Sequence, residues 1–161
     1  MGSNLELEYV YRKVDITNES SGNSIAELTN AERNRLDRNG AVHRASIGYL
    51  FEFGDNHKLR PQIGMNYDDL DGEAMANTGY NLQLTYLYHL DPVSLVLNAY
   101  SRPADYDQRN PVFGKTREDD LYGASASVYY TNPWGWSLVG SQSARFFVTG
   151  AYGGADSNID F

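Results

Sequence analysis

The sequence contains no cysteine, which excludes disulfide bridges, thiol catalysis and cysteine-ligated zinc or iron–sulfur sites. It also lacks an apolar run of roughly 18 residues, the length that a membrane-spanning helix requires. Its mean hydropathy of −0.54 favours a soluble protein. Mean hydropathy does not exclude a membrane β-barrel, because the strands of such a barrel alternate lipid-facing and lumen-facing residues and therefore have a low mean hydropathy.

Basic residues are few as well: 13 Lys and Arg against 21 Asp and Glu give a net charge of −8. This excess of acidic groups argues against nucleic acid as a partner, because a nucleic-acid-binding surface needs a basic stripe to meet the phosphates. The start of the chain, Met1-Gly2-Ser3, has no signal-peptide pattern and is typical of a vector remnant. We therefore expect one domain, of β-barrel type, over residues 4–161.

What the chain does have is alternation. Apolar and polar residues alternate in six segments of about ten residues each, a pattern that predicts β-strands. A seventh apolar stretch, residues 136–152, is too long for one strand, and residues 140–143 in it are typical of a bulge or a hairpin tip. The sequence therefore predicts an all-β, antiparallel meander of seven or eight strands. The six regular segments are residues 5–12, 44–53, 59–67, 80–89, 93–101 and 122–130.

The segments between these strands alternate in length. Short turns are expected at residues 54–57, 91–92 and 132–135, and long loops at residues 17–40, 68–77 and 103–119. All long loops then emerge at one end of an up-and-down meander, as in outer-membrane barrels. Within the first long loop, residues 28–39 predict a short helix, with Thr29 and Glu32 as a capping box and Gly40 as its stop.

Two interpretations of the alternation remain open. In a soluble β-barrel or sandwich the apolar face is the core, and such a domain would bind an apolar ligand or partner. In a membrane barrel the apolar face meets lipid and the polar face lines a lumen. The expected lumen-facing residues are Glu6, Glu8, Arg12, Arg44, Glu52, Arg60 and Gln62.

Three features favour the membrane interpretation: the loop asymmetry, strand lengths near the roughly 9–11 residues of a membrane strand, and the positions of the tyrosines. Tyrosines lie towards strand ends on the apolar face, where an aromatic girdle meets the lipid headgroups. The expected girdle consists of Tyr9, Tyr11, Tyr67, Tyr80, Tyr88, Tyr122 and Tyr130.

Sites for chemistry are not apparent. The acidic stretch 68–73 fails as a calcium loop, because with Gly72 in the sixth position Tyr67 and Thr78 would have to be ligands. Glu118, Asp119 and Asp120 are interpreted as a solvated loop end.

Three histidines (His43, His57 and His89) lie on separate elements, so no metal or cofactor is expected. His89 with Ser125 and Ser127 falls short of a catalytic triad, and we expect no enzyme activity.

Three segments also carry a resemblance: residues 110–120, residues 36–40 and the ending 155–161. They resemble the C-terminal half of an uncharacterised family of proteobacterial outer-membrane proteins, a domain of unknown function. The resemblance implies an outer-membrane β-barrel and implies no activity. Relative to that family the chain lacks an N-terminal half and a signal sequence, and Phe161 stands where the family continues into a last strand, which leaves closure of the barrel open.

The resulting expectation is a bacterial outer-membrane barrel that acts as a passive channel or a structural surface protein, without catalysis. Its partners would be membrane lipid and small solutes or ions. Open strand edges would allow self-association.

Overall fold

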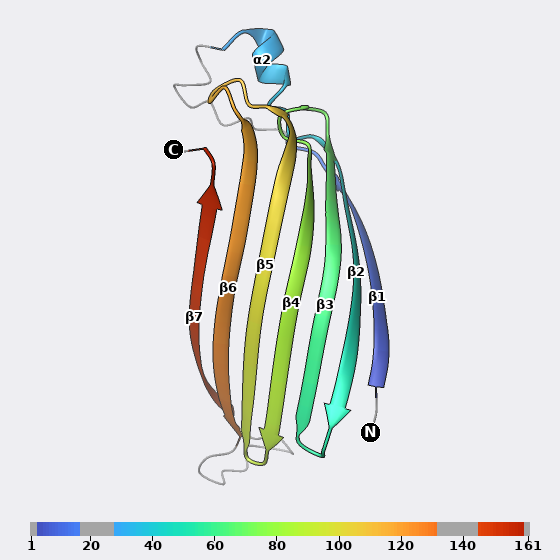
Figure 1. The fold of residues 1–161 in the computed structure, drawn as a ribbon, viewed down its shortest axis with the longest axis vertical. Coiled ribbons are helices and arrows are strands. Elements are labelled where there is room, and N and C mark those ends of the chain that lie inside the picture. Colours follow the sequence, from blue (N-terminus) through green and yellow to red (C-terminus); the bar gives the residue numbers. More distant parts are fainter. Residues whose placement is uncertain (1–2, 17–27, 132–144, 160–161) are drawn as a thin grey trace, which may run out of the picture.

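The computed structural model describes residues 3–16, 28–131 and 145–159. These form one seven-stranded sheet in which each strand pairs with its neighbours in the chain, in the order β1-β2-β3-β4-β5-β6-β7 (Figure 1). Every pair is antiparallel, which confirms the all-β meander with seven strands. The strands are β1 (Ser3–Val14), β2 (Gly40–Phe53), β3 (His57–Leu70), β4 (Asn77–Leu90), β5 (Val93–Arg109), β6 (Thr116–Thr131) and β7 (Arg145–Ser157).

The strands extend further than predicted at the end with the long connections. The loop expected at residues 103–119 shrinks to residues 110–115, because β5 continues to Arg109 and β6 begins at Thr116. Glu118, Asp119 and Asp120 therefore belong to β6, and their interpretation as a loop end was wrong. The reason is that backbone hydrogen bonds between paired strands form whether the side chains are polar or apolar.

The predicted helix is present but short. α2 covers only Asn30–Asn34, and Thr29 and Glu32 form the predicted capping box. Gly40 is not its stop: the helix ends before it, and Gly40 begins β2 with a φ of 139°. Among the described residues no helix has both the length and the apolar character needed to cross a membrane.

Residues 35–39 leave the helix because their backbone groups pair with the next long connection. Asp71 N donates to Asn39 O (2.8 Å), Gly72 N to Asp37 O (3.2 Å) and Ala74 N to Arg35 O (3.0 Å). These contacts join two long connections at one end of the sheet (Figure 1). The predicted turn at 132–135 and the predicted bulge at 140–143 lie outside the described residues.

The register assigns the residues to two faces. One row runs across the first four strands from Leu7 to Ile47, Ile63 and Leu82, and the next row from Glu6 to Gly48, Gln62 and Gln83. Because residues directly opposite each other share a face, one face of the whole sheet is apolar and the other is polar. The alternation read from the sequence thus keeps its phase from strand to strand.

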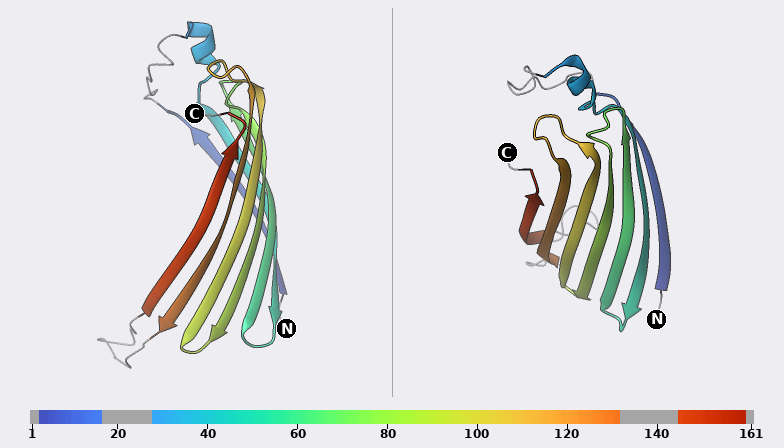
Figure 2. Two further views of the ribbon diagram at one scale, coloured as in Figure 1. Left: turned by 60° about the vertical axis from the view of Figure 1, so that its left-hand side comes forward. Right: turned by 45° about the horizontal axis from the view of Figure 1, so that its top comes forward.

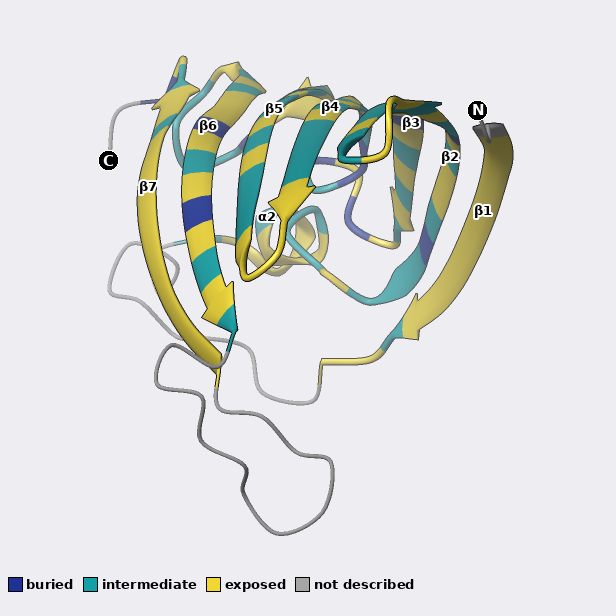
Figure 3. Ribbon diagram, turned by 90° about the horizontal axis from the view of Figure 1, so that it is seen from below, coloured by how far each residue is buried: buried dark blue, intermediate teal, exposed yellow. Residues whose placement is uncertain are grey.

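The sheet curls into an arc, and its edge strands β1 and β7 stay apart, so the sheet is not closed into a barrel (Figures 2 and 3). Side chains on the inside of an arc converge and shield one another from solvent. All strand residues that are buried lie on the polar face, which is therefore the concave face; the apolar face is convex. These buried residues are Val42, Gly48, Gly64, Asn77, Gly79, Gly123 and Ser127.

The two free edges run in the same direction, because β1 and β7 are both odd-numbered strands of an up-and-down meander. They cannot pair directly with each other in the antiparallel manner of the rest of the sheet. An all-antiparallel barrel needs an even number of strands, whereas closure of β1 directly onto β7 would make one parallel pair in a barrel with an odd number of strands.

Candidate functional site

The concave face holds all the residues that the sequence assigned to a lumen. The pairing register gives Glu6, Glu8 and Arg12 of β1 the same face as Arg44 of β2. The other members lie on that face of β2 and β3: Glu52, Arg60 and Gln62.

The curvature brings some of these charges together across three strands. Arg60 of β3 reaches over Gly48 of β2 and forms an ion pair with Glu6 of β1, at 2.5 Å. Arg60 passes close to position 48, since a Cβ there would lie 3.6 Å from the Arg60 Nε, in van der Waals contact. Glu52 pairs with Lys58 at 2.5 Å. Arg12, Arg44 and Glu8 form no ion pair with any described residue.

Neutral polar side chains connect the middle strands of the concave face. Gln83 Nε2 donates to Asn98 Oδ1 (3.0 Å), which also accepts from the Thr85 hydroxyl (3.0 Å). Gln62 Nε2 donates to Ser46 Oγ (2.9 Å). Most of this network was missed from the sequence, although it occupies the polar positions of the same alternation.

Glycines on the concave face make room for larger side chains. The Tyr100 ring lies over Gly123, where a Cβ would be 2.7 Å from the Tyr100 Oη. That tyrosine was also missed, because it stands at a polar position of the alternation. Six glycines share this face, and their small size suits its tight curvature: Gly40, Gly48, Gly64, Gly79, Gly123 and Gly153.

A hollow of about 350 Å³ lies on the concave face around Gly64. Its polar lining comes from four strands and carries charges of both signs. The lining includes Glu8, Arg44, Ser46, Arg60, Gln62, Asn66, Asn81 and Gln83. Arg60 Nε is buried there without a hydrogen-bond partner, although its guanidinium holds Glu6 through another nitrogen.

The convex face carries all the predicted girdle tyrosines. Tyr88 and Tyr130 lie near the short turns, and the others lie in the half of each strand that leads to the long connections: Tyr9, Tyr11, Tyr67, Tyr80 and Tyr122. Two contacts link the tyrosines of this face with histidines. Tyr9 Oη lies 2.8 Å from His43 Nδ1, and Tyr86 Oη lies 2.8 Å from His57 Nδ1.

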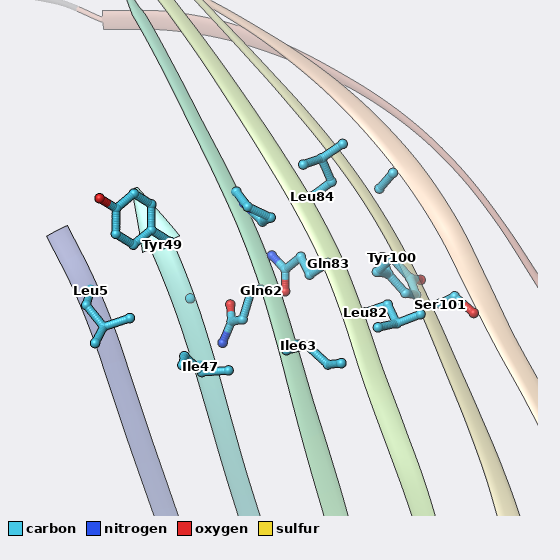
Figure 4. Close-up of a pocket in the computed structure, with 13 residues that line it drawn as sticks. Leu5, Ile47, Tyr49, Gln62, Ile63, Leu82, Gln83, Leu84, Tyr100 and Ser101 are labelled. Carbon is cyan, nitrogen blue, oxygen red and sulfur yellow. The ribbon is translucent and has the colours of Figure 1, made fainter. Parts of the chain in front are cut away.

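Between these tyrosines the convex face is aliphatic and uncovered. Ile47, Ile63 and Leu84 are 44%, 52% and 47% exposed, so they do not form a dry core. Small residues and the spacing of the strands leave a shallow apolar hollow of about 710 Å³ over β1 to β5 (Figure 4). A second hollow of about 660 Å³ lies over β4 to β7.

Formal charge is confined to one end of the convex face. In β3 the uncharged convex stretch runs from His57 to Tyr67, close to the roughly 9–11 residues of a tilted membrane strand. Every Asp, Glu, Lys or Arg at a described convex strand position lies near the long connections. These residues are Lys13, Asp69, Asp105, Asp107, Arg109, Glu118, Asp120 and Asp156.

The histidines and serines do not converge. His89 Nδ1 lies 2.7 Å from Ser94 Oγ, whereas Ser127 Oγ lies 2.8 Å from Thr149 Oγ1. In the part of the chain that the structure describes, no three His, Asp or Glu side chains are grouped to hold a metal ion. The candidate functional site is thus the sheet itself, with one polar and one apolar face.

Comparison with known proteins gives a family and no named relative. Searches of curated proteins and of solved structures found no match. One family, described as "Protein of unknown function (DUF2860)", matches residues 1–161. Because the match covers the whole chain, this protein belongs to the DUF2860 family.

Proposed function

We propose that this chain forms part of an outer-membrane β-barrel and acts as a passive channel or a structural surface protein. Its convex face lies in the hydrocarbon layer, and its concave face lines an aqueous lumen. Membrane lipid and small solutes or ions are its partners, and it performs no catalysis.

One observation carries the proposal: the apolar side chains of the sheet are on the outside of its curve and remain uncovered. In water, an apolar surface of this extent would be strongly unfavourable. In lipid it is the favourable arrangement, and tyrosines at both borders suit the headgroup region. The restriction of convex charge to one end agrees with this, since a charge at the bilayer centre is costly.

The test is flotation with lipid vesicles. The purified chain, refolded from denaturant, is mixed with vesicles of phosphatidylcholine and centrifuged through a density gradient. We expect it to float with the vesicles, to resist carbonate extraction and to aggregate when neither lipid nor detergent is present. A chain that stays monodisperse in buffer and remains at the bottom of the gradient would contradict the proposal.

A second candidate, a soluble sheet protein that binds an apolar ligand, is favoured by the hollows on the convex face. The larger one is lined by aliphatic residues from adjacent strands, including Ile47, Pro61, Ile63 and Leu84. This candidate predicts a soluble chain that takes up a fatty acid at a defined stoichiometry. The flotation experiment separates it from the membrane proposal.

A further inference from the structure

We infer that the lumen formed by this sheet prefers anions over cations, with Arg44 and Arg102 as the residues that set the preference. This inference rests on the proposed channel function and adds the class of solute that the channel admits. It is unexpected for a chain with a net charge of −8.

Charge is unevenly distributed between the lumen wall and the rest of the chain. On the concave face of the described strands, basic residues outnumber acidic ones. The basic residues are Arg12, Arg44, Lys58, Arg60, Arg102, Arg117 and Arg145, and the acidic ones are Glu6, Glu8, Glu52, Asp68 and Asp119. The chain's excess of acid therefore lies off this wall.

Most carboxylates of the concave face are already held in ion pairs. Glu6, Glu52 and Asp119 are held in ion pairs by Arg60, Lys58 and Arg117, the last at 2.7 Å. Asp68 accepts a hydrogen bond from the neutral amide of Asn77 (3.3 Å), which leaves its charge uncancelled. A carboxylate held in an ion pair contributes little attraction for a passing cation.

Two arginines near the middle of the wall, Arg44 and Arg102, form no ion pair with a described carboxylate. Arg102 donates from Nε to Asn81 Oδ1 (3.2 Å), and its guanidinium lies 4.9 Å from the centroid of the Tyr100 ring. Both partners are neutral, so they orient the guanidinium without cancelling its charge. Arg44 forms no ion pair with a described residue and lines the hollow around Gly64.

Asn81 places the two arginines next to the same hollow. It accepts a hydrogen bond from Arg102 and lines the hollow that Arg44 also lines. Glu8 is the opposing charge at this hollow, where it faces both Arg44 and Arg60. Rings and tracks of Arg or Lys in a lumen select anions, and their field is strong because the surrounding wall has a low dielectric constant.

The test is the zero-current potential of the refolded chain in a planar lipid bilayer with a KCl gradient. We expect a potential of the sign that chloride permeation produces. In the double variant Arg44→Glu/Arg102→Glu, the chloride-to-potassium permeability ratio should fall to about half or less. Arg44→Gln/Arg102→Gln should give an intermediate value, which separates charge from side-chain shape.

Lys13→Glu is the matched control, because it reverses one charge at the convex end of β1 and should leave the ratio unchanged. Circular dichroism in detergent confirms that each variant keeps its strand content. Conductance without anion preference, or an equal shift in the Lys13 variant, would overturn this inference and leave the channel intact. A wild-type chain that inserts and never conducts would overturn both this inference and the channel, and would leave the structural surface protein.

Discussion

The two faces of the sheet share one backbone but pack their side chains in opposite ways. On the concave face, polar side chains converge and are satisfied by one another, as in the Gln83–Asn98–Thr85 contacts. On the convex face, apolar side chains diverge and contact no covering layer, as the exposure of Ile63 illustrates. Curvature, and not residue polarity alone, therefore determines which face is shielded.

The largest effect is expected from placing one positive charge on either face at adjacent positions of β4. Leu84→Arg puts a guanidinium at the middle of the convex face, where the proposed contact with lipid predicts a cost of about 2–4 kcal/mol of unfolding free energy. Gln83→Arg puts the same group on the concave face and should cost less than about 1.5 kcal/mol, the value of the hydrogen bonds it replaces. Denaturant unfolding from phospholipid vesicles measures both. Equal losses of unfolding free energy in the two variants would contradict the proposed difference between the two faces.

A medium effect is expected from filling space on the concave face. Gly123→Val puts a Cβ against the Tyr100 ring, and overpacking of this kind costs about 1–3 kcal/mol. Gly150→Val is the control, since a Cβ there meets no atom within 4 Å on the convex side of β7. The same unfolding measurement should detect a loss only in the first variant. A Gly150 loss as large as that of Gly123 would contradict the tight packing assigned to the inside of the curve.

A smaller effect is expected from the Arg60–Glu6 ion pair. Their side chains are 37% and 44% exposed, so water screens the pair. A double-mutant cycle with Arg60→Gln and Glu6→Gln should give a coupling energy below about 1 kcal/mol that decreases further at high salt. A much larger, salt-independent coupling would mean that the concave face is dry and not a lumen.

The smallest effect lies in α2, away from both faces. The hydrogen bond from the Thr29 hydroxyl to Glu32 (2.7 Å), aided by the Thr29 backbone N–H and by Arg35, lowers the pKa of Glu32. A lowered pKa means that the carboxylate stabilises the folded helix above its unfolded pKa, and this stabilisation is lost as the pH falls through the folded pKa. In Thr29→Val, a carboxyl NMR titration should show the Glu32 pKa rising. An unchanged titration would refute the capping box.

Much of the sheet could be predicted from the sequence, because period-two alternation determines both the strands and the face of each residue. The residues expected in a lumen all share one face of the sheet, and the tyrosines expected in a girdle all share the other. The strand ends could not be predicted: residues such as Asp105 and Glu118 are held in the ladder by backbone pairing that their polarity does not reveal.

Contacts across several strands were equally hidden. Arg60 of β3 meets Glu6 of β1 across β2 on the inside of a curve, and alternation carries no information about curvature. The short helix also depends on tertiary contact, since residues 35–39 pair with the connection at 71–74. Local capping chemistry predicted where α2 begins but not where it ends.

The central claim is that lipid is the solvent of the convex face, and spin labelling tests this claim most directly. The chain has no cysteine, so single cysteines at positions 82, 83, 84 and 85 of β4 can each carry a nitroxide in phospholipid vesicles. We predict that oxygen, which concentrates in lipid, relaxes labels 82 and 84, and that a water-soluble nickel complex relaxes labels 83 and 85. Nickel accessibility that is highest at 82 and 84 would contradict the account.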